Sequence, residues 1–184
     1  MELKTVMRNA PSLSEGLRNL AEDIKAELGD NITLVEIGSY MGESAEIFAQ
    51  VLPNAKIICI DPFEGNFDDS DPCSNDNYSE VEQQFDLRTS AYPNIQKMKG
   101  YSTDFKIRCD VVYIDARHFY DGVKEDILQW KPLVGGIISG HDYYEENSPT
   151  YIQNTHIRGV KTAVDENLGK PDKTYSDGSW MKKI

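Results

Sequence analysis

The chain has 184 residues, a formal net charge of -12 and an apolar fraction of 39%. This length fits one domain with a sizeable core, and we expect a single domain over residues 1–184. The acidic balance argues against a general affinity for nucleic acid or anionic membranes, because both depend on clustered Lys and Arg. Three cysteines without C-x-x-C spacing signal neither disulfides nor zinc, and no targeting or membrane-spanning segment is visible, so a cytoplasmic location is expected.

Helices and strands are predicted to alternate along the chain. The leading helix is expected over 12–29, where Ser12-x-x-Glu15 has the pattern of a capping box and leucines recur at helical spacing up to Gly29. The pattern then predicts strands at 33–37, 56–60, 95–99, 111–114 and from 137, and helices at 43–52, 79–90, 120–130 and 160–168.

Two stretches and the C-terminus break this alternation. Residues 62–78 and 143–155 are rich in polar and turn-forming residues, which predicts long irregular loops of the kind that cover active sites. Asp177-Gly178 lies between two strand-like runs and predicts an antiparallel hairpin at the end of the sheet. We therefore expect an α/β, Rossmann-like, doubly wound and mostly parallel seven-stranded sheet with an antiparallel C-terminal hairpin.

A glycine turn between the first strand and its helix suggests a nucleoside cofactor. Gly38 leaves room where the loop meets a ligand, and Gly42 lets the helix begin close to the strand, where free N–H groups attract a carboxylate. Asp61 ends the second strand, where its oxygens are placed to accept hydrogen bonds from both ribose hydroxyls. The alternative is that both glycines only shape a tight turn and that Asp61 caps a loop.

Four ordered blocks resemble class I S-adenosylmethionine-dependent methyltransferases, in particular the methyltransferase 24 or macrocin O-methyltransferase-like group. They are Val35-Glu-Ile-Gly38-x-x-x-Gly42-x-Ser44, Ile60-Asp61, Tyr113-Ile-Asp115-x-x-His118, and Gly136-x-x-x-Gly140-His-Asp142-Tyr143. With the terminal hairpin, the resemblance covers residues 33–184. It implies a cofactor-binding and catalytic core over these residues, with S-adenosylmethionine lying across the carboxyl ends of the first strands.

The resemblance and the loop positions together give a set of expected cofactor contacts. Glu36 either supports the glycine loop or is an edge-facing, solvated side chain. Phe63 and Tyr101 are expected to flank the adenine ring and Ser102 to bind its edge, unless they only pack. The expected cofactor-binding residues are Glu36, Gly38, Ser39, Tyr40, Gly42, Ser44, Asp61, Pro62, Phe63, Tyr101, Ser102 and Asp115.

A second group of polar residues is expected at the same edge of the sheet. Asp115 follows the fourth strand, and His141 and Asp142 follow the fifth, so a right-handed crossover brings them together. As possible ligands, Asp115, His141 and Asp142 suit Mg²⁺ or Ca²⁺, which would lower the pKa of a substrate hydroxyl. His141 occupies a position where metal-dependent relatives carry a carboxylate, which weakens this metal prediction.

His118, Asp115 and His141 are the expected catalytic residues. A neutral His118 suits the removal of a proton from the attacking atom, while a helix cap or a hydrogen bond to Asp142 is the alternative. His156 is expected to be solvated. Methyl transfer mainly requires alignment, exclusion of water and removal of one proton.

The predicted activity is methylation of a small-molecule acceptor, most simply on oxygen, with no nucleic-acid or membrane partner. Two alternatives remain: an NAD-dependent oxidoreductase and a non-catalytic binding protein of the same fold. The sequence argues against the oxidoreductase, because the loop from Gly38 to Gly42 lacks the middle glycine that lets a pyrophosphate approach the backbone. The sequence leaves the acceptor and the oligomeric state open, a homo-oligomer included.

Overall fold

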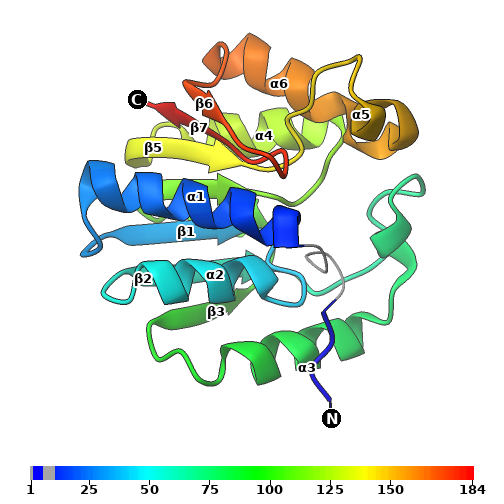
Figure 1. Cartoon of the computed structure of the whole chain (residues 1–184). Coiled ribbons are helices and arrows are strands. Elements are labelled where there is room, and N and C mark those ends of the chain that lie inside the picture. Colours follow the sequence, from blue (N-terminus) through cyan, green and yellow to red (C-terminus); the bar gives the residue numbers. More distant parts are fainter. Residues whose placement is uncertain (1, 6–10) are drawn as a thin grey trace.

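Seven strands form one mixed sheet in the order β3-β2-β1-β4-β5-β7-β6 (Figure 1). The structure is a computed structural model that describes residues 2–5 and 11–184, and the side chains of residues 2–5 and 14–184. The strands are β1 (Thr33–Ile37), β2 (Lys56–Asp61), β3 (Ile95–Lys99), β4 (Cys109–Ile114), β5 (Val134–Gly140), β6 (Lys173–Thr174) and β7 (Trp180–Lys183).

Strands β1 to β5 are parallel, and β7 runs antiparallel to both β5 and β6. Asp177-Gly178 lies in the connection between β6 and β7, where Gly178 has a φ of 86° that favours glycine. The Rossmann-like sheet with an antiparallel C-terminal hairpin is confirmed.

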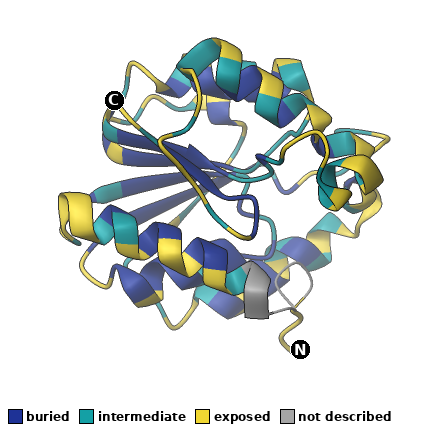
Figure 2. Ribbon diagram, turned by 45° about the horizontal axis from the view of Figure 1, so that its top comes forward, coloured by how far each residue is buried: buried dark blue, intermediate teal, exposed yellow. Residues whose placement is uncertain are grey.

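Helices cover both faces of the sheet, and the exposed residues of these helices lie on their outer surfaces (Figure 2). The helices are α1 (Pro11–Leu28), α2 (Glu43–Val51), α3 (Tyr78–Thr89), α4 (Tyr120–Trp130), α5 (Pro149–Gln153) and α6 (Arg158–Leu168), with 3-10 turns η1 (Pro72–Asn75), η2 (Ser102–Asp104) and η3 (Thr155–Ile157).

Strand residues alternate between two separate cores. Leu34 packs with residues of α1, α2 and α3, whereas its neighbour Val35 packs with residues of α4 and α6. Because successive strand side chains point to opposite faces, a strand covered on both sides reads as one continuous apolar run. The apolar segments of the central strands have this origin.

Two predicted features differ from the structure. α1 begins at Pro11, and the predicted capping box at Ser12 lies outside the described side chains. The stretch 143–155, predicted to be irregular, contains α5 and the start of η3; Ser148 caps α5 by accepting a hydrogen bond from the Tyr151 N–H, followed by Pro149 in the first turn. Within the described part of the chain, no helix is long and apolar enough to cross a bilayer.

Candidate active site

A cavity of about 630 Å³ opens along the carboxyl ends of the parallel strands. Ligands of α/β sheets bind at this edge, where the strand order reverses between β1 and β4. The expected site residues that line it are Gly38, Ser39, Tyr40, Ser44, Asp61, Pro62, Tyr101, Ser102, Asp115, His118, His141 and Asp142. Most residues expected to contact cofactor or acceptor therefore share one space.

The loop after β1 is held by the last residue of β2. Asp61 Oδ2 accepts hydrogen bonds from the backbone N–H groups of Ser39 (3.0 Å) and Tyr40 (2.9 Å), and Oδ1 accepts one from Phe63 (2.7 Å). Burial raises the pKa of the Asp61 carboxyl and outweighs these hydrogen bonds, which lower it. Tyr40 has a φ of 45°, a left-handed conformation uncommon outside glycine. Asp61 thus fixes the shape of the cavity wall.

The two glycines of this loop are required for different reasons. Gly38 has a φ of 83°, and a Cβ added there would lie 2.2 Å from the carbonyl oxygen of Asp115. The chain after β4 therefore leaves no room for a side chain at Gly38, which also lines the cavity. Gly42 has a φ of 78° at the N-cap of α2, and an added Cβ would lie 3.1 Å from the ring of Phe85. Gly42 is not among the described residues that line the cavity.

Glu36 lies behind the glycine loop, inside the sheet. Its side chain is fully buried on β1, beside Cys59 of β2 and Tyr113 of β4. The interpretation of Glu36 as an edge-facing, solvated residue is wrong, because β1 is a central strand with neighbours on both sides. Burial raises the pKa of this carboxyl. Glu36 is not among the described residues that line the cavity.

One end of the cavity is formed by the residues that follow β3. Tyr101 donates a hydrogen bond from its hydroxyl to Glu64 Oε2 (2.7 Å), and Ser102 donates one to Asp126 Oδ1. Asp126 is 1% exposed, and burial raises its pKa to about 6. Its second oxygen, Oδ2, is buried and has no hydrogen-bond partner among the described residues. Glu64 and Asp126 both line the cavity. They are two further polar residues of the site that were not predicted from the sequence.

Phe63 belongs to the core. It is 5% exposed, and its ring packs edge to face on Phe85 of α3, with 5.5 Å between ring centroids. Phe63 is not among the described residues that line the cavity. Its position therefore does not match the expected place beside adenine. The left-handed backbone at Phe63, with a φ of 51°, accompanies this inward-facing ring.

The residues after β4 and β5 form a compact carboxylate–imidazole cluster. His118 Nε2 lies 3.3 Å from Asp142 Oδ2 and 3.5 Å from Asp115 Oδ1. His141 Nδ1 lies 3.3 Å from Asp142 Oδ1 and 3.8 Å from Asp115 Oδ1. Asp142 adopts a left-handed φ of 60°, which is uncommon for a residue other than glycine. The crossover between β4 and β5 therefore brings together all four residues singled out from the sequence.

A fifth member, Asp71, comes from the long loop after β2. Asp71 is 4% exposed and N-caps η1 by accepting a hydrogen bond from the Cys73 N–H at 2.8 Å. Its other oxygen, Oδ2, lies 3.0 Å from His118 Nδ1. The sequence analysis missed Asp71; the only local signal was an Asp before Pro72, which is typical of a helical N-terminus.

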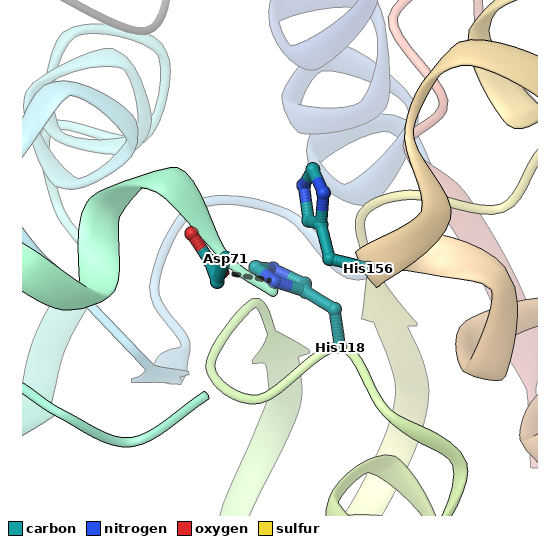
Figure 3. A group of neighbouring side chains, drawn as sticks. All are labelled: Asp71, His118 and His156. Carbon is teal, nitrogen blue, oxygen red and sulfur yellow. Dashed lines mark hydrogen bonds and ion pairs between the residues drawn. The ribbon is translucent and has the colours of Figure 1, made fainter. Parts of the chain in front are cut away.

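His156 also faces the cavity, which corrects the expectation that it is solvated. It lies on η3, is partly buried and lines the same cavity. Its ring centroid is 5.8 Å from that of His118 (Figure 3). The residues of α5 and η3 thus form one wall of the site, opposite the loop that carries Asp71.

The cluster changes the protonation of its members. Burial lowers the pKa of His118, but the hydrogen bonds to Asp115 and Asp71 and the charge of Asp142 outweigh it and raise this pKa well above its usual value. Burial raises the pKa of Asp142, but the neighbouring His141 and His118 outweigh it and hold this pKa well below its usual range. These shifts favour the protonated form of His118 and the ionised form of Asp142.

The closest set of potential metal ligands differs from the expected one. Ligand atoms of Asp115, His118 and Asp142 lie within 4.8 Å of one another, and a second such group joins Asp71, His118 and His156. His141, which was expected as a ligand, is absent from both groups among the described residues. His118 belongs to both groups, and His141 Nδ1 also lies near the two aspartates, 3.3 Å from Asp142 Oδ1 and 3.8 Å from Asp115 Oδ1.

These features define an α/β protein of the Rossmann-like methyltransferase fold. The family model described as "Methyltransferase domain" matches residues 35–143, and the chain belongs to this family. Comparison with curated proteins gave no match.

Three solved structures illustrate the similarity in fold. A protein from Staphylococcus aureus, provisionally described as a caffeoyl-CoA O-methyltransferase, has a TM-score of 0.63 and 14% identity, over 98% of this chain and 85% of that one. Human N-acetylserotonin methyltransferase, in complex with SAM, has a TM-score of 0.62 and 13% identity over 92% and 51%. A provisional rRNA-methylase from Clostridium thermocellum has a TM-score of 0.59 and 13% identity over 92% and 97%.

Proposed function

We propose that this protein transfers the methyl group of S-adenosylmethionine to an oxygen of a small-molecule acceptor. The observation that carries the proposal is the continuity of one cavity from the glycine loop to the carboxylate–imidazole cluster. A cofactor bound at the glycine loop would present its methyl group toward the carboxylate–imidazole cluster. Because the sulfonium is already a strong methyl donor, the protein has to align the acceptor, exclude water and manage one proton.

Asp61 can accept a further hydrogen bond, which is available for the cofactor's ribose. Its Oδ2 accepts two backbone hydrogen bonds and its Oδ1 accepts one, whereas each carboxylate oxygen can accept about two. Oδ1 is therefore the atom proposed to accept a ribose hydroxyl. The unpartnered Oδ2 of Asp126, at the end of the cavity formed after β3, is proposed to accept the adenine amino group.

His118 is the proposed proton acceptor, and Asp71 holds its ring. Nδ1 of the ring faces Asp71, whereas Nε2 faces Asp142 in the carboxylate–imidazole cluster. Nε2 is therefore the nitrogen proposed to meet an acceptor hydroxyl. Its raised pKa means that the group becomes a base only when the surrounding negative charge is reduced or the pH is high. His141 and Asp115 line the same space and would orient the acceptor.

The residues present also fit a divalent cation. Two carboxylates and one imidazole at close range suit an ion such as Mg²⁺ or Mn²⁺ that keeps several waters. Asp115, Asp142 and His118 would hold it, and it would supply a lower pKa for the acceptor hydroxyl. Binding of the ion through Nε2 would be an alternative to the role of His118 as proton acceptor, because one nitrogen cannot hold both. The proposal of a small acceptor rather than RNA rests on the net charge of -12, which opposes phosphate binding.

Isothermal titration calorimetry with S-adenosylhomocysteine, S-adenosylmethionine and NAD tests the cofactor. We expect both sulfur nucleosides to bind and NAD to give no heat. Asp61→Ala should weaken binding by at least about 10-fold, since it removes a charged hydrogen-bond acceptor. Asp69→Ala, at an exposed position of the following loop, is the matched control and should bind as the unmodified protein does.

Three results would contradict the proposal. Binding of NAD alone would favour an oxidoreductase. Absence of heat with either sulfur nucleoside would favour a non-catalytic protein. Unchanged affinity in Asp61→Ala would remove the proposed ribose contact.

A further inference from the structure

All three histidines of the chain line the one cavity described above, but they belong to different groups of side chains. His118 is shared between two groups, because its two ring nitrogens face in different directions. Nε2 faces Asp115 and Asp142, whereas Nδ1 faces Asp71. In Figure 3, His156 lies beside this ring and Asp71 points at it from the loop after β2.

The group on the Nδ1 side is rich in nitrogen. Asp71, His118 and His156 each offer one ligand atom, and the three atoms lie within 4.8 Å of one another. Two imidazoles and one carboxylate suit zinc or a similar transition-metal ion, whereas the oxygen-rich group on the Nε2 side suits Mg²⁺. We propose that Asp71, His118 and His156 form a second metal site, selective for ions of the Zn²⁺ class.

The surroundings of these residues support a built site. Asp71 is buried and its Oδ1 is fixed by the Cys73 N–H, which leaves Oδ2 directed at His118. His156 is only partly buried and lies on the cavity wall, which gives an ion a way in. The three ligands come from the loop before η1, the loop after β4, and η3. An ion there would tie the long loop to the α5–η3 wall.

Occupation of this site would also act on the proposed reaction, and this consequence rests on the proposed function. A neutral imidazole that ligates a metal through one nitrogen carries its proton on the other. With Nδ1 bound to the metal, the proton stays on Nε2, which then donates toward Asp115 and Asp142. His118 can no longer accept a proton from an acceptor hydroxyl. The second site is therefore inhibitory.

Zinc titration calorimetry, supported by the visible absorption of bound Co²⁺, tests the site in the intact chain. We expect one Zn²⁺ to bind, with at least about 10-fold weaker affinity in His156→Ala, because even outer-shell changes cost metal sites about 10–100-fold. His141→Ala is the matched control: it removes a histidine of the same cavity that is outside the group. Asp142→Asn removes a ligand that belongs only to the group of Asp115, His118 and Asp142. Both should retain Zn²⁺ binding.

Three outcomes overturn the second site. One is equal zinc affinity in His156→Ala and the unmodified protein; another is loss of zinc binding in Asp142→Asn together with retention in His156→Ala, which would place the ion with Asp115 and Asp142. The third is absence of any zinc binding. Binding of S-adenosylhomocysteine to the same samples without metal separates these results from a failure of the proposed function, and thermal unfolding shows whether each variant folds.

Discussion

Asp71 Oδ2 lies 3.0 Å from His118 Nδ1, a contact that joins residues 47 positions apart in the chain. The long loop after β2 is thereby fastened to the residue that faces the acceptor end of the cavity. Burial raises the pKa of the Asp71 carboxyl, but the hydrogen bonds with His118 and the Cys73 N–H outweigh it and leave this pKa below its usual value, so the carboxylate stays ionised at neutral pH.

Asp71→Asn should lower the pKa of His118, because a nearby carboxylate favours imidazolium. The raised pKa of His118 stabilises the folded protein at a pH below the unfolded value near 6.5, and this contribution is lost as the pH rises through the folded pKa. NMR titration of the three histidines measures the shift. Asp69→Asn, in the same loop but exposed, should leave His118 unchanged; the same pKa in Asp71→Asn would refute the coupling.

Gly38→Ala should prevent cofactor binding and strongly destabilise the fold. Its added Cβ would meet the Asp115 carbonyl oxygen at 2.2 Å, in addition to the left-handed backbone with a φ of 83°. Gly29→Ala isolates the backbone contribution, since Gly29 has a φ of 76° with no atom within 4 Å of the added Cβ. We expect about 1–2 kcal/mol of destabilisation for Gly29→Ala and more for Gly38→Ala in urea unfolding. Equal losses would show that the close approach is unimportant.

Arg88→Met should destabilise the protein by about 3–5 kcal/mol, the usual result of removing one partner of a buried ion pair. The guanidinium of Arg88 donates to Met41 O in the glycine loop (3.0 Å) and pairs with Glu46 (2.7 Å) and Glu43 (3.5 Å). Affinity for S-adenosylhomocysteine should fall with it. Arg18→Met, where the guanidinium is exposed and donates a hydrogen bond to Gln50 Oε1, should change stability by less than about 0.5 kcal/mol. Comparable losses in both variants would argue against the buried pairing.

Asp126 should make the ligand-free protein less stable as the pH rises. Burial raises its folded-state pKa to about 6 from an ordinary 3.8, so the folded state binds more protons than the unfolded state between these values. The free energy of unfolding therefore falls from pH 4 to above 6, by about 3 kcal/mol at most from this group.

Asp126→Asn removes this titration, so its stability relative to the unmodified protein should increase over that range in urea unfolding. Asp121→Asn, at an exposed position of the same helix, is the control and should show no such trend. A constant difference between Asp126→Asn and the unmodified protein across these pH values would mean that Asp126 is ionised when folded.

Much of the fold could be predicted because its signals are local. The apolar runs that became β1, β2 and β4, the glycine at the start of α2 and the Asp-Gly pair before β7 each depend on neighbouring residues. The positions of Asp115, His118, His141 and Asp142 followed from one rule, that carboxyl ends of parallel strands meet at the same edge. No comparable rule applies to the loops. Asp71 and His156 reach His118 only through the closure of two irregular segments, and Phe63 faces inward because α3 presents Phe85.

The sequence by itself determined the succession of strands and helices, the mixed sheet and the edge at which the site is built, since periodicity and turn chemistry act over a few residues. Tertiary structure alone decided which side chains meet there. It buried Glu36 inside the sheet, placed the rings of His118 and His141 beside the two aspartates, and brought Asp71 and His156 to the imidazole of His118. The physical reason is that such contacts depend on packing between segments far apart in the chain, which spacing along the sequence does not encode.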